Sequence, residues 1–263
     1  MYRIKIRSRH PSHSALRKIL PKLPYRSVVR FGSETDLNDT VSNGGKRIEI
    51  NTIEAVRNSA NKLRMKTCFT QGKVPTAKWQ TLEEYISKPS LEFPIVVKHI
   101  FGSRNKSNFL IKDKKEFESC IKGKTTKKYI VEEFKNFTRE YRLHVTKNGC
   151  FYSCRKMIKE DTPKEQRWFR NDSNSVWIIE ENPSFDRPSN WKTIEKDCVN
   201  ALKSVGLDVG AVDLKVQSST NKKGEKRKDP EYIVIEINSA PSFGDITLKK
   251  YKEIIPKLIT EKK

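Results

Sequence analysis

The amino-acid sequence predicts a mixed α+β fold, and three patterns along the chain indicate it. Two segments near the C-terminus, 206–215 and 232–238, are rich in β-branched residues and are typical of strands. Apolar residues in the segments 53–63 and 191–205 recur at the spacing of amphipathic helices. The turn-forming pair Asn148-Gly149 separates two further strand-like stretches. A chain of 263 residues with this mixture is long enough to bury a sizeable core.

The first part of the chain predicts little regular structure before a helix. Residues 1–50 are basic and irregular, with one strand candidate at 27–31. Asn51 is a good N-cap residue, and Glu54 three positions later completes a variant of the capping box. We therefore expect a helix that begins at Asn51 and stops before Gly72.

The middle of the chain, residues 93–158, predicts a β-rich unit with one short helix. The expected strands are 93–100, 109–111, 129–134, 140–145 and 151–157, and the expected helix is 114–121. The stretch 159–188 is expected to be mostly loop. Helical spacing resumes at 191–205, where Gly206 ends the helix, and again at 248–258.

Composition points to an anionic partner and to the cytoplasm. The net charge of +22 attracts nucleic acid, acidic protein tails or phosphorylated small molecules. The densest basic run, 222–228, favours a solvated hairpin loop. The sequence contains neither an apolar run near the ~20 residues of a membrane span nor a signal-peptide core. Five cysteines without zinc-type spacing favour free thiols in a reducing compartment.

A metal site is predicted where the two C-terminal strands pair. Side chains alternate faces along a strand, so Glu236 and Asn238 share one face of their strand. The same alternation places Ile233, Ile235 and Ile237 together on the other face. With Asp213 from the paired strand, the polar face offers three oxygen ligands that suit Mg²⁺ and, through it, nucleotide phosphates. Two ordinary strands with solvated polar faces are the alternative.

Other polar residues upstream suit a nucleotide. Lys98 lies in an apolar strand followed by a polar loop, which favours a clamp for triphosphate oxygens. The strand that ends at Glu132-Glu133-Phe134 offers backbone groups for an adenine edge, and the nearby Glu140 offers a carboxylate for ribose hydroxyls. Lys156 adds a further cation.

These polar residues follow one another along the chain in an order that resembles the ATP-grasp superfamily. Within it, the chain resembles the carboxylate–amine ligases that attach glutamate to ribosomal protein and related phage-encoded ligases. The pieces that carry the resemblance are "FPIVVK", "YIVEEF", "EYRLHV", "GLDVGAVDLKV" and "VIEINSAPSFG". The resemblance implies an ATP-grasp fold with two α/β subdomains that clasp ATP. It implies a reduced N-terminal region at 1–50 and an ATP-grasp domain at 51–263, divided into a small subdomain at about 90–135 and a metal-binding subdomain at 136–263.

The resemblance also implies a role for each site residue. Nucleotide binding would fall to Lys62, Lys98, Ser103, Glu132, Glu133, Phe134 and Glu140. Lys62 and Lys98 would hold the α- and β-phosphates, and Glu140 the ribose. Asp213, Glu236 and Asn238 would coordinate Mg²⁺, or Mn²⁺ in its place. Lys156 would contact the γ-phosphate, and Arg170 with Asn171 would stabilise an acyl phosphate.

The implied activity is ATP-dependent joining of a carboxylate to an amine, with release of ADP and phosphate. The charge suggests an acidic small molecule, peptide or protein as acceptor, and it also admits nucleic acid. A kinase of a polyphosphorylated small molecule and a non-catalytic nucleic-acid-binding protein on the same scaffold are the alternatives.

Three departures from the family pattern stand out. The loop 102–107 keeps a single glycine where relatives have several. Ala211 stands where many relatives have an arginine, so another cation is needed, with Arg155, Arg167 and Arg170 as candidates. The N-terminal region is short, so we expect much of the acceptor-binding surface to be either reduced or supplied by a partner.

Four more residues have a structural and a functional interpretation. Arg142 and His144 share a face with Glu140 and are candidates to line the site, although a lone strand histidine is more often structural. Trp168 and Trp177 lie in the loop-rich stretch, and core packing is favoured over base stacking for both.

Overall fold

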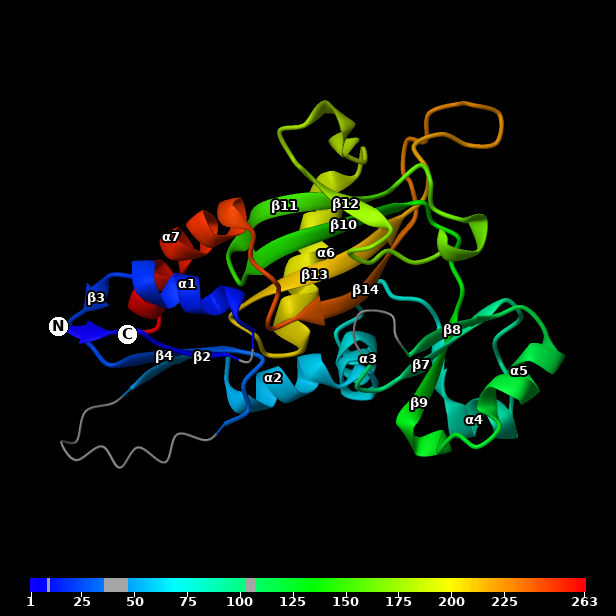
Figure 1. Cartoon of the computed structure of the whole chain (residues 1–263), viewed down its shortest axis with the longest axis horizontal. Coiled ribbons are helices and arrows are strands. Elements are labelled where there is room, and N and C mark those ends of the chain that lie inside the picture. Colours follow the sequence, from blue (N-terminus) through cyan, green and yellow to red (C-terminus); the bar gives the residue numbers. More distant parts are fainter. Residues whose placement is uncertain (9, 36–46, 103–106) are drawn as a thin grey trace.

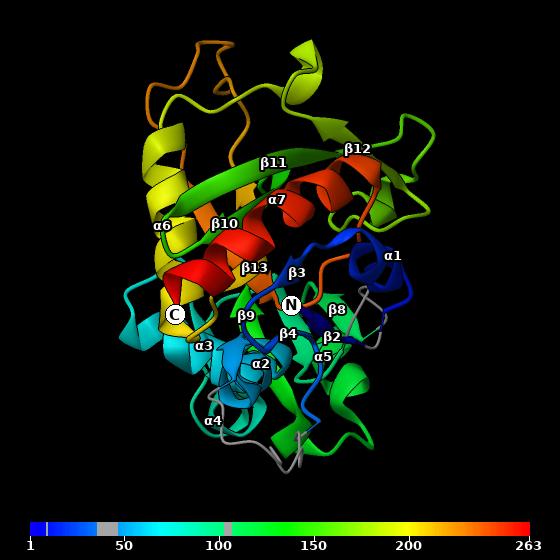
Figure 2. The ribbon, with the colours of Figure 1, turned by 90° about the vertical axis from the view of Figure 1, so that its left-hand side faces the viewer.

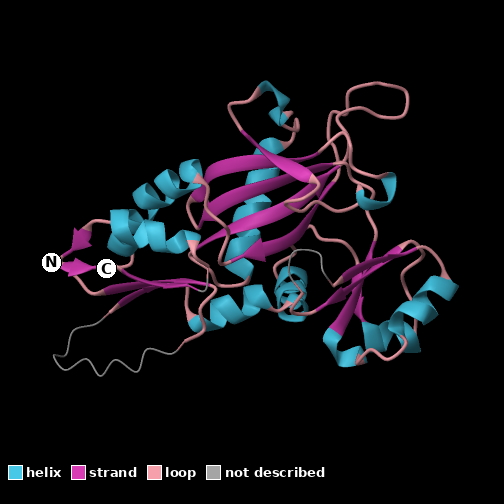
Figure 3. Cartoon of the chain, viewed as in Figure 1, coloured by secondary structure: helices cyan, strands magenta, loops and turns pink. Residues whose placement is uncertain are grey.

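The computed structural model describes residues 1–8, 10–35, 47–102 and 107–263. Its helices and strands gather in three regions around four sheets (Figures 1 and 3). A small parallel sheet and the two chain ends lie on one side, a large antiparallel sheet lies at the top, and a four-stranded antiparallel sheet lies on the other side. No helix in these described ranges is long and apolar enough to cross a membrane.

The N-terminal region forms a small α/β layer, so the expectation of an irregular segment at 1–50 is wrong. Strands β2 (Lys5–Ser8), β4 (Ser27–Phe31) and β5 (Ile48–Ile50) form a parallel sheet in the order β2-β4-β5. Strands β1 (Tyr2–Arg3) and β3 (Lys22–Leu23) pair separately, and helix α1 (Ser12–Ile19) follows β2. Of these strands only the one at 27–31 was predicted, because the others have two to four residues and are too short to show a strand pattern.

The last helix of the chain completes this layer. Helix α7 (Asp245–Glu261) returns to the N-terminal sheet, and both termini lie at the end of the molecule that faces the viewer in Figure 2. Its Tyr251, Ile255 and Ile259 share one apolar cluster with Leu16 and Phe31. Burial of apolar surface between the two ends of the chain therefore stabilises strands that local sequence leaves weak.

The expected helix 51–71 is two helices with a different start. Thr52 is the N-cap of α2 (Ile53–Ala60), because its hydroxyl accepts a hydrogen bond from the Ala55 backbone N–H. Asn61 interrupts the helix and caps α3 (Lys62–Gln71) through the Arg64 backbone N–H. The predicted end before Gly72 is confirmed.

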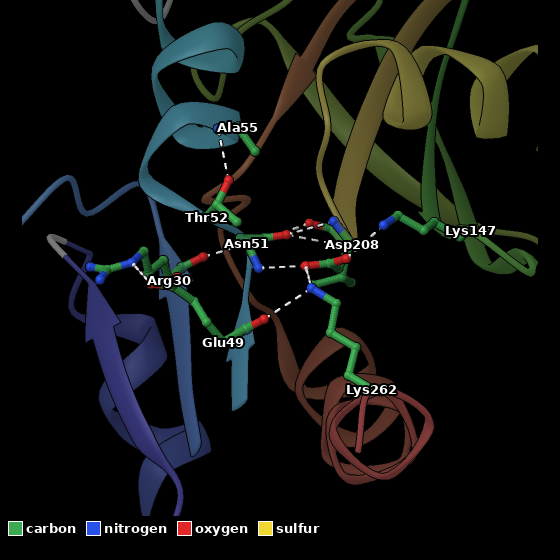
Figure 4. Close-up of polar contacts among 9 residues, drawn as sticks. Arg30, Glu49, Asn51, Thr52, Ala55, Lys147, Asp208 and Lys262 are labelled. Atoms are coloured by element: carbon green, nitrogen blue, oxygen red, sulfur yellow. Dashed lines mark hydrogen bonds and ion pairs between the residues drawn. The ribbon is translucent and has the colours of Figure 1, made fainter. Parts of the chain in front are cut away.

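Asn51 joins the N-terminal layer to the large sheet instead of capping a helix. Its φ of 60° is a left-handed conformation that asparagine tolerates better than most residues. The buried side chain donates to the carbonyls of Arg30 and Val209, and its oxygen accepts from the backbone N–H groups of Asp208 and Val209. The Asp208 carboxylate accepts from the Asn51 N–H and pairs with Lys147 and Lys262 (Figure 4).

The four-stranded sheet has the order β6-β9-β7-β8. Its strands are β6 (Trp79–Thr81), β7 (Ile95–His99), β8 (Asn108–Ile111) and β9 (Tyr129–Glu133). Helices α4 (Leu82–Ser87) and α5 (Lys114–Ile121) and the 3₁₀ turn η1 (Thr126–Lys128) accompany them. Leu82, Tyr85 and Phe117 from the helices pack on Ile95 and Val131. The predicted strands and helix α5 are confirmed, whereas β6 and α4 were not predicted.

The large sheet has the order β12-β11-β10-β13-β14, and all its pairs are antiparallel. Its strands are β10 (Arg139–Thr146), β11 (Gly149–Ile158), β12 (Ser175–Ile179), β13 (Val209–Val216) and β14 (Tyr232–Asn238). Helix α6 (Trp191–Ser204) packs on one face through Ile194, Cys198 and Leu202. The stretch 159–188 is mostly loop, as predicted, and contains in addition β12 and the turns η2 (Lys164–Gln166) and η3 (Pro183–Phe185).

Candidate active site

A cavity of about 470 Å³ opens where the three regions meet. Its walls come from the start of α3, from β7 and β9, from the polar face of the large sheet, and from the N-terminal layer at His10 and Gly32. This volume lies in the range of small-molecule and cofactor sites. All the predicted site residues within the described ranges line it. Ser103 lies outside the described residues.

Three lysines and one carboxylate form the cluster at one end of the cavity. Lys98 Nζ donates a hydrogen bond to Glu132 Oε2 at 2.8 Å, and Lys66 Nζ lies 3.4 Å from Glu132 Oε1. Burial opposes ionisation of Glu132, but Lys66 and Lys98 hold its pKa below the ordinary value. Lys62 donates to the Gly102 carbonyl, and its backbone N–H donates to Ile100. Burial lowers the pKa of Lys62, and Glu236 offsets part of this effect.

The chain segment after β9 forms an aromatic and backbone edge. Glu132 pairs through its backbone with β6 and with β7. The next residues, Glu133, Phe134 and Lys135, line the cavity. The Phe134 and Trp168 rings meet edge-on, with 6.5 Å between the ring centres. Lys135 Nζ lies 2.6 Å from Glu133 Oε1. Backbone and ring surfaces of this kind can receive a planar base.

Glu140 is surrounded by cations. Arg170 Nη1 donates to Glu140 Oε2 at 3.4 Å, and Lys215 lies close enough to interact with the same carboxylate. Burial raises the pKa of Glu140, against the influence of Lys215 and Arg170. Burial also lowers the pKa of Lys215 to about 8, although Glu140 favours its charged form. Lys156 Nζ donates to the Arg170 carbonyl and lies 5.0 Å from the centre of the Trp177 ring.

Asp213, Glu236 and Asn238 converge as predicted. Asp213 lies opposite Glu236 in the β13–β14 ladder. The Asn238 amide nitrogen lies 3.2 Å from Asp213 Oδ2 and 3.3 Å from Glu236 Oε1, so the three side chains face one point. No cluster of three His, Cys, Asp or Glu side chains suited to a metal occurs among the described residues, and this group has two carboxylates and an amide. A turn of the Asn238 amide would direct its oxygen to the same point, so the donor set fits a hard divalent cation.

The expected face for the three isoleucines is wrong. A β-bulge between the Asp213 and Leu214 positions places Leu214 opposite Val234. One extra residue in β14 changes which side chains face the core. Val234 and Ile237 pack in the core, and Ile237 also borders the cavity. The half-buried Ile233 and Ile235 line the cavity with Glu236.

The cation beside Asp213 is Arg142, and not one of the three candidates named for the missing arginine. Strand register places Arg142 opposite Asp213 across β10 and β13. Arg155 donates to the carbonyls of Ser184 and Phe185, and Arg167 donates to carbonyls of its own loop. Arg170 pairs with Glu140.

Other predicted residues divide between site and structure. His144 is buried and bonds the Tyr251 hydroxyl at 3.1 Å, and burial lowers its pKa to about 3, so it is structural. Trp168 and Trp177 line the cavity, which corrects the expectation of core packing. Asn171 also lines the cavity, but its side-chain oxygen accepts from Ser173 and Asn174 in a local turn.

The sequence analysis did not identify Lys66 and Lys215 as site residues, because a lysine in an amphipathic helix or strand is usually solvated.

Comparison with known proteins bears on the fold. Residues 61–160 match the family model of the RimK-like ATP-grasp domain. The fold is similar to D-alanine–D-alanine ligase from Bacillus anthracis, with a TM-score of 0.63, 14% identity, and coverage of 100% of this chain and 97% of that chain. It is also similar to N5-carboxyaminoimidazole synthetase from Staphylococcus aureus complexed with ADP, with a TM-score of 0.61, 14% identity, and coverage of 89% and 60%. A search of curated protein sequences gave no match.

The fold is therefore that of the ATP-grasp superfamily, which confirms the resemblance predicted from the sequence. The matched segment contains the lysine cluster, Glu132–Phe134, Glu140 and Lys156, so the nucleotide-side half of the cavity lies within it.

Proposed function

We propose that the chain is an ATP-dependent carboxylate–amine ligase that works through an acyl phosphate and releases ADP and phosphate. One observation carries the proposal: Lys62 and Lys98 line the same cavity as the paired carboxylates Asp213 and Glu236. Cations for phosphate oxygens and hard oxygen ligands for a divalent metal ion are the two requirements of a phosphoryl-transfer site. The relatives by fold include a ligase crystallised with ATP.

The chain's own residues would divide the work by position. Lys62 and Lys98 would bind the nucleotide phosphates, and the segment 133–135 would receive the adenine, with Glu140 at the ribose. Asp213, Glu236 and Asn238 would hold Mg²⁺, or Mn²⁺ in its place. The metal ion, when bound, neutralises charge on the transferring phosphoryl group.

Cationic side chains near the strands β10 and β11 would stabilise the acyl-phosphate intermediate. Lys156 and Arg170, with Asn171 nearby, would hold the phosphoryl group and the acyl phosphate by charge-assisted hydrogen bonds. In the first step a carboxylate oxygen bonds to the γ-phosphorus and the bond to ADP breaks. In the second an amine nitrogen bonds to the acyl carbon, the bond to phosphate oxygen breaks, and the amine loses a proton. Phosphate leaves far more readily than the original carboxylate oxygen.

The substrate class follows from charge. With a net charge of +22 we propose an acidic small molecule, peptide or protein as acceptor. The five cysteines are free, which supports action in a reducing cytoplasm.

Trapping with hydroxylamine tests this function directly. Purified protein is incubated with ATP, Mg²⁺ and a panel of carboxylic acids, and hydroxylamine converts any acyl phosphate into a hydroxamate that mass spectrometry detects. We expect a hydroxamate together with ADP and phosphate, and none with Glu236→Ala. Glu231→Ala, which removes an exposed carboxylate before the same strand, is the matched control and keeps activity.

Two other results would favour a different function. A stable phosphorylated product without hydroxamate would favour a kinase on this scaffold. No ATP turnover, combined with salt-dependent nucleic-acid binding that ATP does not alter, would favour a non-catalytic binding protein.

A further inference from the structure

Lys66 is the one lysine of the Lys62–Lys66–Lys98 cluster that has no exposed surface. Lys62 and Lys98 line the cavity, whereas Lys66 lies behind them on the next turn of α3. Helix α3 itself lies between the large sheet and the four-stranded sheet (Figure 1). A buried ammonium needs a partner of opposite charge, because removal from water strongly disfavours the charged form.

The partner of Lys66 is the carboxylate that Lys98 also uses. Glu132 is buried between them, with Lys98 Nζ 2.8 Å from Oε2 and Lys66 Nζ 3.4 Å from Oε1. Lys66 Nζ also donates to the Thr76 hydroxyl, which donates to the Val234 carbonyl on β14 at 2.9 Å. The ammonium of Lys66 is therefore held on two sides, by a carboxylate and by a hydroxyl that is itself fixed to the large sheet.

The charges of this cluster do not balance without a ligand. One carboxylate faces two ammonium groups, so a positive charge remains beside the cavity. A phosphate group that entered the cavity would attract Lys98, which has three N–H donors, away from Glu132. Without Lys66, that movement would leave the Glu132 carboxylate buried and unpaired, which is strongly unfavourable.

We propose that Lys66 is a positioning residue that neutralises Glu132 and thereby frees Lys98 to bind the phosphate groups of the nucleotide. The inference rests on the proposed function, because it takes the ligand of Lys98 to be ATP. Lys66 itself does not touch the nucleotide. It acts through Glu132, so its effect depends on the charge of that carboxylate.

A double-mutant cycle tests this dependence. The affinity for a non-hydrolysable ATP analogue with Mg²⁺ is measured by calorimetry for the wild type, Lys66→Met, Glu132→Gln and the double variant. We expect Lys66→Met to weaken binding about 10- to 100-fold in the wild-type background, as for coupled neighbours in one charge network. In the Glu132→Gln background the same substitution should change affinity by less than about threefold, because no charge is left to neutralise.

Lys73→Met is the matched control, since it removes one exposed positive charge just after α3. It should bind the analogue as the wild type does. If Lys66→Met does not fold, the comparison of Glu132→Gln with the double variant still tests the inference, because a weaker affinity of the double variant would overturn it.

Three results would count against the account. Equal weakening by Lys66→Met in both backgrounds would mean that Lys66 attracts the phosphates directly, and an unchanged affinity of Lys66→Met would mean that Lys98 needs no such help. Either result overturns the inference and leaves the proposed function standing. A wild-type protein that does not bind the analogue overturns the proposed function, and the inference with it.

Discussion

Arg142 and Asp213 form a two-point ion pair in the wall of the cavity. Arg142 Nε donates to Asp213 Oδ1 at 2.6 Å, and Nη2 donates to Oδ2 at 2.7 Å. Burial disfavours the charged guanidinium, but Asp213 more than compensates and raises the pKa of Arg142. The guanidinium carbon also lies 4.8 Å from the centre of the Trp177 ring. The pair fixes one proposed metal ligand and places a permanent cation beside it.

Arg142→Lys should therefore impair the chemical step more than nucleotide binding. Lysine keeps the charge but cannot make the planar two-point contact with a carboxylate. We expect kcat to fall by roughly 10²-fold, the scale for loss of one preorganised electrostatic contact. Steady-state kinetics with calorimetry of the ATP analogue separates the two effects. A variant with normal kcat would show that the two-point contact has no part in catalysis.

Lys98→Met should weaken nucleotide binding. The substitution keeps the volume of the side chain and removes an ammonium that lines the cavity. Loss of one charged hydrogen bond should reduce the affinity for the ATP analogue about 10- to 100-fold. The exposed Lys112, just after β8 in the same sheet, gives the control Lys112→Met. Equal affinities of wild type and Lys98→Met would remove Lys98 from the phosphate site.

Stability should depend on pH through Lys66. Burial lowers its pKa from 10.5 to about 8 in the folded protein, against the influence of Glu132. Between these two values the unfolded chain holds a proton at Lys66 that the folded chain has released, so the free energy of unfolding rises with pH. Below pH 8 both states are protonated and this contribution is constant.

Urea unfolding of the wild type and Lys66→Met from pH 7 to pH 10 checks the sign. The stability of the wild type relative to the variant should increase as the pH rises above 8. A difference that stays level, or that falls over this window, would contradict the lowered pKa.

Asn51→Ala should destabilise the fold at the junction of the N-terminal layer and the large sheet. Alanine removes the side-chain hydrogen bonds to Arg30, Asp208 and Val209 and must adopt a φ of 60°. Together these effects predict a loss of about 2–5 kcal/mol in the free energy of unfolding. Asn51→Gly loses the same bonds without the backbone strain and should lose roughly 1 kcal/mol less. Urea denaturation measures both, and a neutral Asn51→Ala would show that the junction contributes little.

The sequence pattern within a single segment was sufficient to predict an element where the spacing of its apolar residues matches the face that it buries. Helix α5 and strands β13 and β14 follow from spacing and β-branched content, and Asp213 and Glu236 meet because their strands are neighbours in the sheet. The capping residue was misplaced by one position, because Asn51 is engaged by residues more than 150 positions away. Such a long-range contact leaves no local signal.

The rest of the site depended on tertiary packing. Lys66 is buried, and Lys215 half-buried, only because α3 and β13 face other elements. Arg142 meets Asp213 through a strand register that the sequence does not specify. Strand β12 was missed because it lies at the edge of the large sheet and pairs only with β11. A loop separates these two strands in the sequence, and the other strands of the sheet are more distant. The division at residue 50 and the subdomain boundaries stay predictions.

The central claim is that the cavity binds ATP together with a divalent metal ion, and thermal unfolding with the non-hydrolysable analogue tests it most directly. Wild-type protein and Glu236→Ala are heated with the analogue, with Mg²⁺, with both and with neither. We expect a stabilisation that requires both ligands, about 2.7 kcal/mol at ~100 times the dissociation constant, and its loss in Glu236→Ala. No shift of the wild type at high ligand concentration would contradict the nucleotide site, and an undiminished shift in Glu236→Ala would contradict the metal assignment.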